Sequence, residues 1–351
     1  MSDHIAINIF NKLIYNKTFG AHKIIATLHS QISHSANTNH SSAVSGLGSD
    51  NMIDPTSGGR ITTLGSGASK NRTVAFLGNL HYNFKERYLL NVGFRYEGNS
   101  KMGVDSRWGG FPSVTASWRL NEENFLKEAE WINEWKMRYG WGRNGNSPGS
   151  SYAYVGTFSP VGEYLGSSAV APDNIQMNNL KWEKGTQHNI GMDFVAWENK
   201  VDLKFEYYIK KSDDLLQTNV NIPSSTGFST VKFFNSGSME NRGWEMMLAL
   251  NNILEVNDFK VSFNMNLSRN RNRVLKLPVN KSYWNYNSVA NGTYAQNVVE
   301  GDPLGSFYGY KYLGVYQSED ETIARDAEGK QLIGMDGKPV YTTINNVLVR
   351  P

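Results

Sequence analysis

Arg87-Tyr88-Leu89-Leu90-Asn91-Val92-Gly93-Phe94-Arg95-Tyr96-Glu97-Gly98 alternates apolar with mostly polar side chains. One set is Tyr88, Leu90, Val92, Phe94 and Tyr96, and the other is Leu89, Asn91, Gly93, Arg95 and Glu97. Successive side chains of a strand point to opposite faces, so this strand would have one apolar face and one mostly polar, charged face. Aromatic residues at both ends of the apolar face are typical of the interfacial belts around a membrane barrel.

Two further segments repeat the pattern. Val201, Leu203, Phe205, Tyr207 and Ile209 alternate with Asp202, Lys204, Glu206, Tyr208 and Lys210. Phe259, Val261, Phe263, Met265 and Leu267 alternate with Lys260, Ser262, Asn264, Asn266 and Ser268. Soluble β-sandwiches also alternate, but a ladder of this length with so many interfacial aromatic residues favours the wall of a membrane barrel.

The composition agrees with that class. The 351 residues include 33 Gly, 18 Tyr, 16 Phe and 9 Trp, and 39% are hydrophobic. No stretch approaches the ~20 apolar residues of a spanning helix, so any membrane crossing must use closed β-structure. Cysteine is absent, which excludes disulfide frameworks and thiolate metal sites. The net charge of +3 comes without a basic stripe, so nothing indicates a nucleic-acid partner.

The chain contains about ten strand candidates, each near the ~10-residue length of a tilted membrane strand. They form five pairs: 5–15 with 21–33, 72–84 with 87–98, 113–120 with 134–143, 186–197 with 200–211, and 243–253 with 258–270. Long polar loops separate the pairs: 34–71, 99–112, 144–185, 212–242, and 271 onward. Short turns at one end and long loops at the other are typical of outer-membrane barrels, whose short turns are periplasmic. The sequence therefore predicts an all-β fold, an antiparallel transmembrane β-barrel portion with long extracellular loops.

Both ends of the chain resemble internal sequence. Met1-Ser2-Asp3-His4-Ile5 runs into a strand-like segment without the basic, apolar and small-residue order of a signal peptide. The chain stops at Val349-Arg350-Pro351, after turn signals at Asp336-Gly337 and Lys338-Pro339. We interpret the sequence as an internal piece of a longer polypeptide.

Several blocks, in this order, resemble the barrel of SusC/RagA-type TonB-linked outer-membrane transporters, that is, TonB-dependent receptors. The blocks are Arg87-Tyr88-Leu89-Leu90, Arg95 to Gly103, Arg107 to Ser113, Ser117-Trp118-Arg119-Leu120, Leu180-Lys181-Trp182-Glu183-Lys184, Lys211 to Leu216, Asn235 to Glu245, and Gly301 to Tyr310. The resemblance covers most of the chain from about Lys70 to Tyr316.

The resemblance implies uptake of large nutrients, typically oligosaccharides or peptides, across the outer membrane of a Gram-negative cell. Its implied partners are outer-membrane lipid, a SusD-like surface lipoprotein and the TonB complex, which would act through a plug and TonB box that this sequence does not display. The family closes a plugged barrel of about 22 strands, so about ten strands make roughly half of one. Residues 1–351 are thus expected to be part of the receptor barrel, with 271–351 a long extracellular loop region and truncated end.

The charged residues at alternate positions of the predicted strands are the best candidates for a functional site. They are Arg95, Glu97, Lys136, Arg138, Asp202, Lys204 and Glu206. Facing a barrel lumen, they would contact the plug or a passing substrate. The alternative is a solvated inner wall on which opposite charges pair, because lumen faces are polar whatever the cargo.

Aromatic residues in the expected loops form a second candidate set. They are Trp108, Phe111, Tyr152, Tyr154, Tyr164, Trp284 and Tyr286. Aromatic faces can stack on sugar rings because they offer apolar area and a quadrupole to C–H groups. The alternative is that these rings rest against neighbouring loops.

Other patterns carry less chemistry. Gly140-Trp141-Gly142-Arg143-Asn144-Gly145 matches G-x-G-x-x-G, but no helix N-terminus follows to hold a dinucleotide. His29, His34 and His40 match no metal-ligand spacing. We therefore expect no catalytic residue, no metal and no cofactor. Two alternatives to a transporter remain: an outer-membrane barrel enzyme, and a secreted soluble β-protein for glycan binding or adhesion.

Overall fold

A computed structural model describes residues 2–49, 51, 54, 56, 59–228, 230–277, 283–284, 295–309, 323–335, 337–340, 343–344 and 347–348. The chain divides into two units. The first comprises Met1–Trp284 and Val298–Ser306, and the second comprises Asn285–Asn297 and Phe307–Pro351. In the second unit, β18 (Thr343–Ile344) pairs with β19 (Val347–Leu348), and isolated bridges join Arg325 to Gln331 and Ile333 to Pro339.

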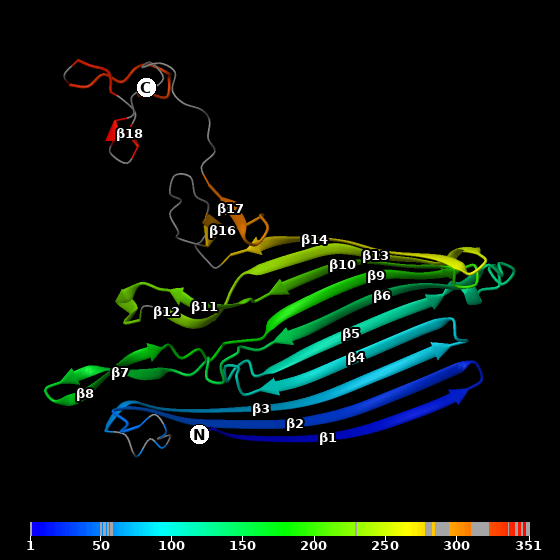
Figure 1. Cartoon of the computed structure of the whole chain (residues 1–351), viewed down its shortest axis with the longest axis horizontal. Helices are drawn as coiled ribbons and strands as arrows, with labels where there is room; N and C mark the ends of the chain where they lie inside the picture. The colour runs from blue at the N-terminus through cyan, green and yellow to red at the C-terminus, as the bar shows by residue number, and fades with distance from the viewer. Residues whose placement is uncertain are drawn as a thin grey trace. The chain divides into compact units, whose positions relative to one another are not determined.

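Ten antiparallel strands form the sheet of the first unit, and their order in the sheet follows the chain (Figure 1). They are β1 (Ser2–Phe19), β2 (His22–Ser45), β3 (Arg60–Phe84), β4 (Tyr88–Asn99), β5 (Trp108–Arg119), β6 (Ile132–Asn146), β9 (Glu183–Ala196), β10 (Val201–Asp213), β13 (Ser238–Val256) and β14 (Phe259–Lys276). The long connections carry two hairpins, β7 (Thr157–Tyr164) with β8 (Ser167–Asn174) and β11 (Leu216–Asn221) with β12 (Thr230–Asn235). The prediction of an all-β antiparallel fold is confirmed.

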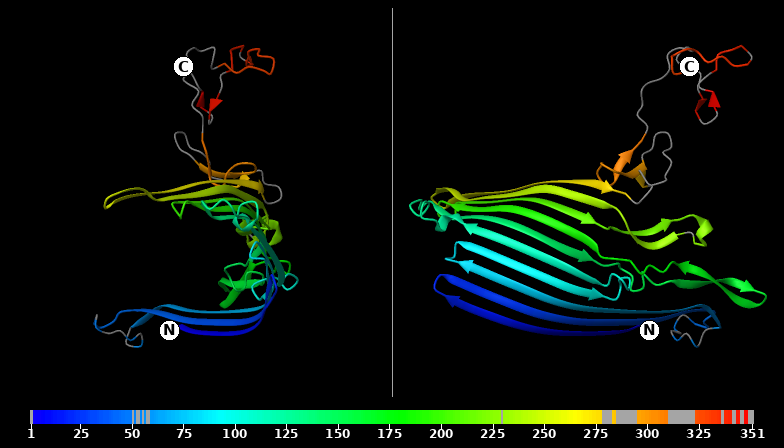
Figure 2. Two further views of the ribbon diagram at one scale, coloured as in Figure 1. Left: turned by 90° about the vertical axis from the view of Figure 1, so that its right-hand side faces the viewer. Right: turned by 180° about the vertical axis from the view of Figure 1, so that it is seen from behind.

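The sheet curves strongly, as the side view in Figure 2 shows for its ten strands. On β4 every apolar alternate from Tyr88 to Tyr96 is exposed, whereas Leu89, Asn91, Gly93, Arg95 and Glu97 are half-buried. The register carries this division across the sheet, because Val92 lies opposite Leu80 and Val114. We call the two sides the apolar face and the polar face, and the lower exposure places the polar face inside the curve.

Aromatic rings line the apolar face near the short turns. Phe19, His22, Phe84, Tyr88 and Trp118 lie directly opposite one another on β1 to β5. Consecutive ring centroids are 5.3, 4.7, 6.3 and 6.3 Å apart. Such a row across five strands has the arrangement of the aromatic girdle at a membrane interface.

Short turns join the strand pairs at one end of the sheet. Lys85 and Glu86 (φ 53° and 57°) and Glu198 and Asn199 (φ 54° and 66°) adopt left-handed conformations. Two consecutive residues with positive φ make the type I′ turn, whose twist matches that of the flanking strands. At the same end, the connection between β5 and β6 begins with a 3₁₀ segment, Leu120–Glu122. Within the described residues, no helix has the length and apolar character to cross a membrane.

Several strands run further than the sequence predicted. The expected loop 34–71 is mostly strand, because β2 continues to Ser45 and β3 begins at Arg60. β14 likewise runs to Lys276 instead of ending at Asn270. Each further residue pair of an in-register hairpin gains ladder hydrogen bonds, which hold these Ser-, Thr- and Asn-rich segments in the strands. These extensions therefore lack the apolar alternation on which the prediction depended.

Candidate functional site

A network of ion pairs crosses three strands on the polar face. The Lys136 ammonium of β6 lies 2.9 Å from Oδ2 of Asp193 on β9. Arg138 reaches two carboxylates: Nη2 is 3.1 Å from Asp193 Oδ1, and Nη1 is 3.1 Å from Glu206 Oε2 on β10. Asn189 donates a further hydrogen bond to Glu206. The two cations of β6 face one carboxylate on β9 and one on β10, so the four charges balance.

Gly191 allows the ion pair between Arg138 and Glu206, which reaches across the intervening strand β9. It lies directly opposite both Arg138 and Glu206, on the strand between them. A Cβ built on Gly191 would lie 2.8 Å from Arg138 Cζ, which is closer than real Cβ atoms approach other atoms. The guanidinium group therefore crosses directly over the β9 backbone to reach Glu206.

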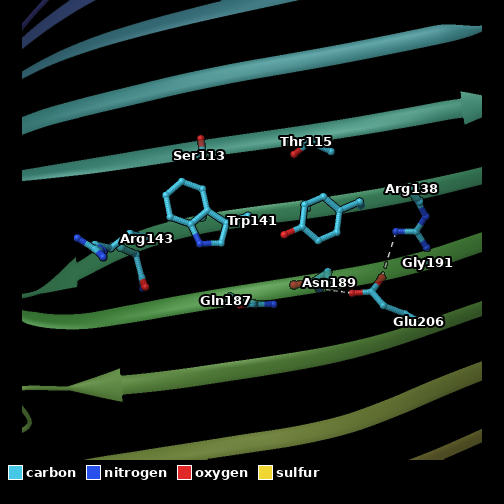
Figure 3. A pocket seen from close by; sticks show the side chains of 13 residues that line it. Ser113, Thr115, Arg138, Trp141, Arg143, Gln187, Asn189, Gly191 and Glu206 are labelled. Carbon is cyan, nitrogen blue, oxygen red and sulfur yellow. Dashed lines mark hydrogen bonds and ion pairs between the residues drawn. The ribbon is translucent and has the colours of Figure 1, made fainter.

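The same region contains a hollow of about 440 Å³ whose lining mixes polar and apolar groups (Figure 3). Gly140, Gly142 and Gly191 leave room for it, because each lacks a side chain at a position on the polar face. Its polar groups come from four neighbouring strands: Ser113, Thr115, Arg138, Asn144, Gln187, Asn189 and Glu206. Hydroxyl, amide, guanidinium and carboxylate groups together can donate to and accept from a hydroxyl-rich or amide-rich ligand.

The charged alternates named from the sequence are paired on this face. Arg95 Nε lies 2.5 Å from Glu97 Oε2, and Lys204 Nζ lies 3.7 Å from Asp202 Oδ2. Asp193 joins Lys136 to Arg138, and Arg138 in turn pairs with Glu206. Their place on the face opposite the apolar residues follows from the register, and contact with a plug or substrate stays a prediction.

A compact cluster lies where the long connections leave the sheet. Met102, Phe111 and Trp182 are buried and contact one another. Trp182 Nε1 donates to the carbonyl of Arg107 over 3.2 Å, and the rings of Phe111 and Trp182 meet edge to face at 5.4 Å. The cluster therefore joins β5 to the connections before it and before β9.

The placement of Trp108 and Phe111 in a loop is wrong, because both lie in β5. Trp108 stacks on Tyr96 at 4.9 Å on the apolar face, and a Cβ on Gly98 would collide with its ring, at 2.8 Å. Phe111 points to the opposite side and is only 8% exposed. The Pro112 that marked the end of the loop is instead a strand residue opposite Phe94.

Four of the remaining aromatic candidates lie within the described residues. Tyr152 accepts a hydrogen bond from the Lys70 backbone N–H over 3.1 Å, and Tyr154 accepts one from Arg107 Nη2 over 3.2 Å. Tyr164 is 73% exposed at the end of β7, and Trp284 belongs to the short strand β15 (Tyr283–Trp284). Tyr286 lies outside the described residues. Stacking on a sugar stays a prediction for all of them.

An ion pair joins the two hairpins of the long connections. Lys232 on β12 donates to Asp173 on β8, which also accepts a hydrogen bond from Thr157 Oγ1 over 3.1 Å. The hydrogen bond from Lys232 is the main reason why the pKa of the Asp173 carboxyl lies below its usual value. The β7–β8 and β11–β12 hairpins are thus linked by a charge-assisted contact.

The sequence did not single out Asp193, Asn189 or Gly191. All three occupy alternate positions of the predicted strand 186–197, so period-two spacing could have placed them on one face with Lys204 and Glu206. Trp182 was noted as part of a motif block, without a role. Its burial depends on Phe111 and Met102, which are about 70 and 80 residues away and which periodicity cannot bring together.

Comparison with known proteins gives one family. Residues 10–346 match the family model described as TonB dependent receptor-like, beta-barrel. The chain is 33% identical over 272 residues to TonB-dependent receptor P39 of Formosa agariphila, an alignment that covers 78% of this chain and 25% of the relative. It is 31% identical over 305 residues to TonB-dependent receptor SusC of Bacteroides thetaiotaomicron, covering 78% of this chain and 30% of the relative. The chain therefore spans less than a third of the length of either relative.

Solved structures share the fold. The RagAB peptide importer in its closed-closed state superposes with a TM-score of 0.79 at 19% identity, over the whole of this chain and 38% of the other. The outer membrane transporter YddB from Escherichia coli gives a TM-score of 0.58 at 12% identity, covering 86% of this chain and 38% of the other.

Proposed function

The chain belongs to the TonB-dependent receptor-like β-barrel family of the Gram-negative outer membrane, and from that membership we infer that it lines the pathway of an active importer of large nutrients. The polar face carries this proposal. It combines paired charges with a hollow of about 440 Å³ that contains hydroxyl, amide and guanidinium groups. The apolar face, with its aromatic row, would contact lipid.

The proposal includes an orientation and a division of the chain. Residues 1–351 form part of the receptor barrel, and the portion of 271–351 that follows the end of β14 at Lys276 contributes a long extracellular region. The long connections face the cell exterior, where a SusD-like lipoprotein would cover them. The TonB complex would supply energy from the periplasmic side.

The lining of the hollow suits two classes of cargo. Arg138, Glu206, Asn189 and Gln187 can recognise oligosaccharide hydroxyls or peptide amides and termini. The structural neighbour RagAB is described as a peptide importer, which favours peptides as the first class to test. Oligosaccharides are the second class, because the hydroxyl and amide groups of the lining suit them equally.

The test is uptake by cells that carry the full receptor containing this chain. Fluorescent peptides and fluorescent oligosaccharides are offered separately, with and without a protonophore. We expect one class to accumulate, the protonophore to abolish that accumulation, and Arg138→Met to reduce it several-fold. Lys260→Gln, which removes an exposed charge paired with Glu255 near the short turns, is the matched control. Accumulation that continues without the proton gradient would contradict active import.

A further inference from the structure

Arginine follows the apolar run of β14 on the apolar face. Phe263, Met265 and Leu267 occupy alternate positions of the strand, and Phe263 and Leu267 are 48% and 45% exposed. The next alternate positions on the same face are Arg269, Arg271 and Arg273, all exposed. On this face, the side chains therefore change from apolar to cationic between Leu267 and the next position, Arg269.

The neighbouring strand adds a fourth guanidinium group to this patch. Arg242 on β13 lies directly opposite Arg271, and Trp244 lies opposite Arg269. Like charges directly opposite each other on a sheet destabilise the pair. Arg242 is 57% exposed and pairs with Glu240 at 2.5 Å. The two strands thus bring like charges together at a position where a polar or neutral pair would be more stable.

Within the described residues, the patch holds more cationic than anionic side chains. Arg273 donates through Nε to the carbonyl of Gly301 over 3.0 Å. Within the part of the chain that the structure describes, Arg269 and Arg271 make no side-chain hydrogen bond or ion pair. Among the described residues, the ion pair of this patch joins Arg242 to Glu240, whereas the cations of the polar-face network are paired with Asp193 and Glu206.

The depth of the patch follows from strand geometry. Residues 259 to 267 span roughly 26 Å along the strand at ~3.3 Å per residue, or about 20 Å along the membrane normal at a tilt of ~40°. That height is close to the ~25 Å apolar band of a membrane barrel. Arg269 and Arg271 then lie at the level of the lipid headgroups, on the side of the long connections.

We propose that Arg242, Arg269 and Arg271 bind the phosphate headgroup of an outer-leaflet lipid whose acyl chains lie against Leu267 and Trp244. This assignment rests on the proposed function only for the membrane orientation of the chain. Arginine suits the role because its planar fork binds phosphate oxygens in pairs and is more weakly hydrated than an ammonium group. A bound phosphate would also relieve the repulsion between Arg242 and Arg271. Charge complementarity and the adjoining apolar side chains together select a lipid over a soluble anion.

The test measures lipid binding directly on the full receptor, purified in neutral detergent. Dihexanoyl phosphatidic acid is titrated and bound copies are counted by native mass spectrometry. Dihexanoylglycerol, which has the same acyl chains and no phosphate, and inorganic phosphate serve as the acyl-only and anion-only probes. The variants are a triple Arg→Gln change at positions 242, 269 and 271, and the corresponding triple Arg→Lys change. A control replaces the exposed Lys17, Lys85 and Lys200, near the short turns, by Gln.

We expect phosphatidic acid to bind the wild type and the control equally, and the Gln variant at least about tenfold more weakly. The affinity of the Lys variant should lie between those of the wild type and the Gln variant, because lysine keeps the charge and loses the paired donors of the guanidinium group. If the Gln variant does not fold, the affinity of the Lys variant relative to the wild type tests the proposal. Equal binding by all variants would overturn the proposal. So would equal retention of dihexanoylglycerol, or displacement of the lipid by inorganic phosphate at the same concentration. Because the readout is lipid binding, failure here leaves the import proposal standing, and failed import leaves this result standing.

Discussion

At the scale of single residues, glycine decides which side chains meet on the polar face. Gly191 lies beneath Arg138, and Gly243 lies beneath Tyr208, whose hydroxyl reaches Asn270 Oδ1 over 3.3 Å. A Cβ on Gly243 would lie 2.5 Å from the Tyr208 hydroxyl oxygen. In both places a long side chain passes over the glycine of the adjacent strand and reaches a residue on the strand beyond it. Alternation predicted the polar face, but these crossings depend on three strands in register and could not be predicted from any one strand.

Replacing Gly191 with alanine should separate Arg138 from Glu206. The new Cβ would displace the guanidinium group, and the loss of a half-buried ion pair should lower the free energy of unfolding by about 1 kcal/mol. Gly140→Ala is the matched control, because a Cβ there meets Thr115 Oγ1 at 3.9 Å, an ordinary contact. Denaturant unfolding in detergent compares the two variants. Equal stabilities would show that the crossing contributes nothing.

A charge on the apolar face should be far more costly than one on the polar face. Val92→Arg places a guanidinium group near the middle of the predicted bilayer and should destabilise the full receptor by about 2 to 4 kcal/mol. Asn91→Arg, one residue away on the opposite face, should cost much less. Unfolding equilibria in lipid vesicles measure both variants. Similar costs would mean that the two faces meet the same solvent.

At the scale of elements, the strands were predictable where they are amphipathic and unpredictable where they are polar. The alternation of β4, β10 and β14 placed these strands correctly, because one face of each is apolar. The outer halves of β2 and β3 consist largely of Ser, Thr, Asn and Gly, which are typical of loops. Pairing with a neighbouring strand stabilises them, and that tertiary contribution leaves no period-two signal.

The link between the two hairpins should fail in acid. Asp173 has a lowered pKa, so its stabilising contact is complete above the ordinary value of about 3.9 and is lost as pH falls through the lowered pKa. Spin labels on cysteines introduced at Ser167 and Ser225 can report the hairpin separation, since the chain has no native cysteine. The distance distribution should stay narrow from pH 7 down to about 3.9 and broaden only as pH falls through the lowered pKa.

Asp173→Asn provides the matched comparison for the hairpin experiment. Without the carboxylate, Lys232 loses its ionic partner, so the distribution should be broad at every pH. A narrow distribution in the variant at pH 7 would show that other contacts hold the hairpins together.

At the scale of the whole sheet, the connections separate into two classes. Turns of two or a few residues and the 3₁₀ segment lie at one end, and the connections with hairpins β7–β8 and β11–β12 lie at the other (Figure 1). The sequence predicted this separation from loop lengths alone. It could not predict the cluster of Met102, Phe111 and Trp182, since burial there needs three distant segments to meet.

The orientation can be tested in intact cells with single cysteines in the full receptor. A cysteine at Ser150, in a long connection, should react with a membrane-impermeant maleimide. A cysteine at Asn199, in a short turn, should react only after the outer membrane is opened. Labelling in the reverse pattern would invert the proposed topology.

The order of strands in the sheet has a consequence for how the sheet assembles. Each strand of the ten-stranded sheet pairs with the sheet strands that precede and follow it along the chain. The two longest connections, from β6 to β9 and from β10 to β13, each contain a hairpin of their own. When two pairing strands are close in sequence, closing the loop between them costs less chain entropy, so their hydrogen bonds can form sooner. The sheet can therefore grow hairpin by hairpin, each finished strand serving as the template for the next.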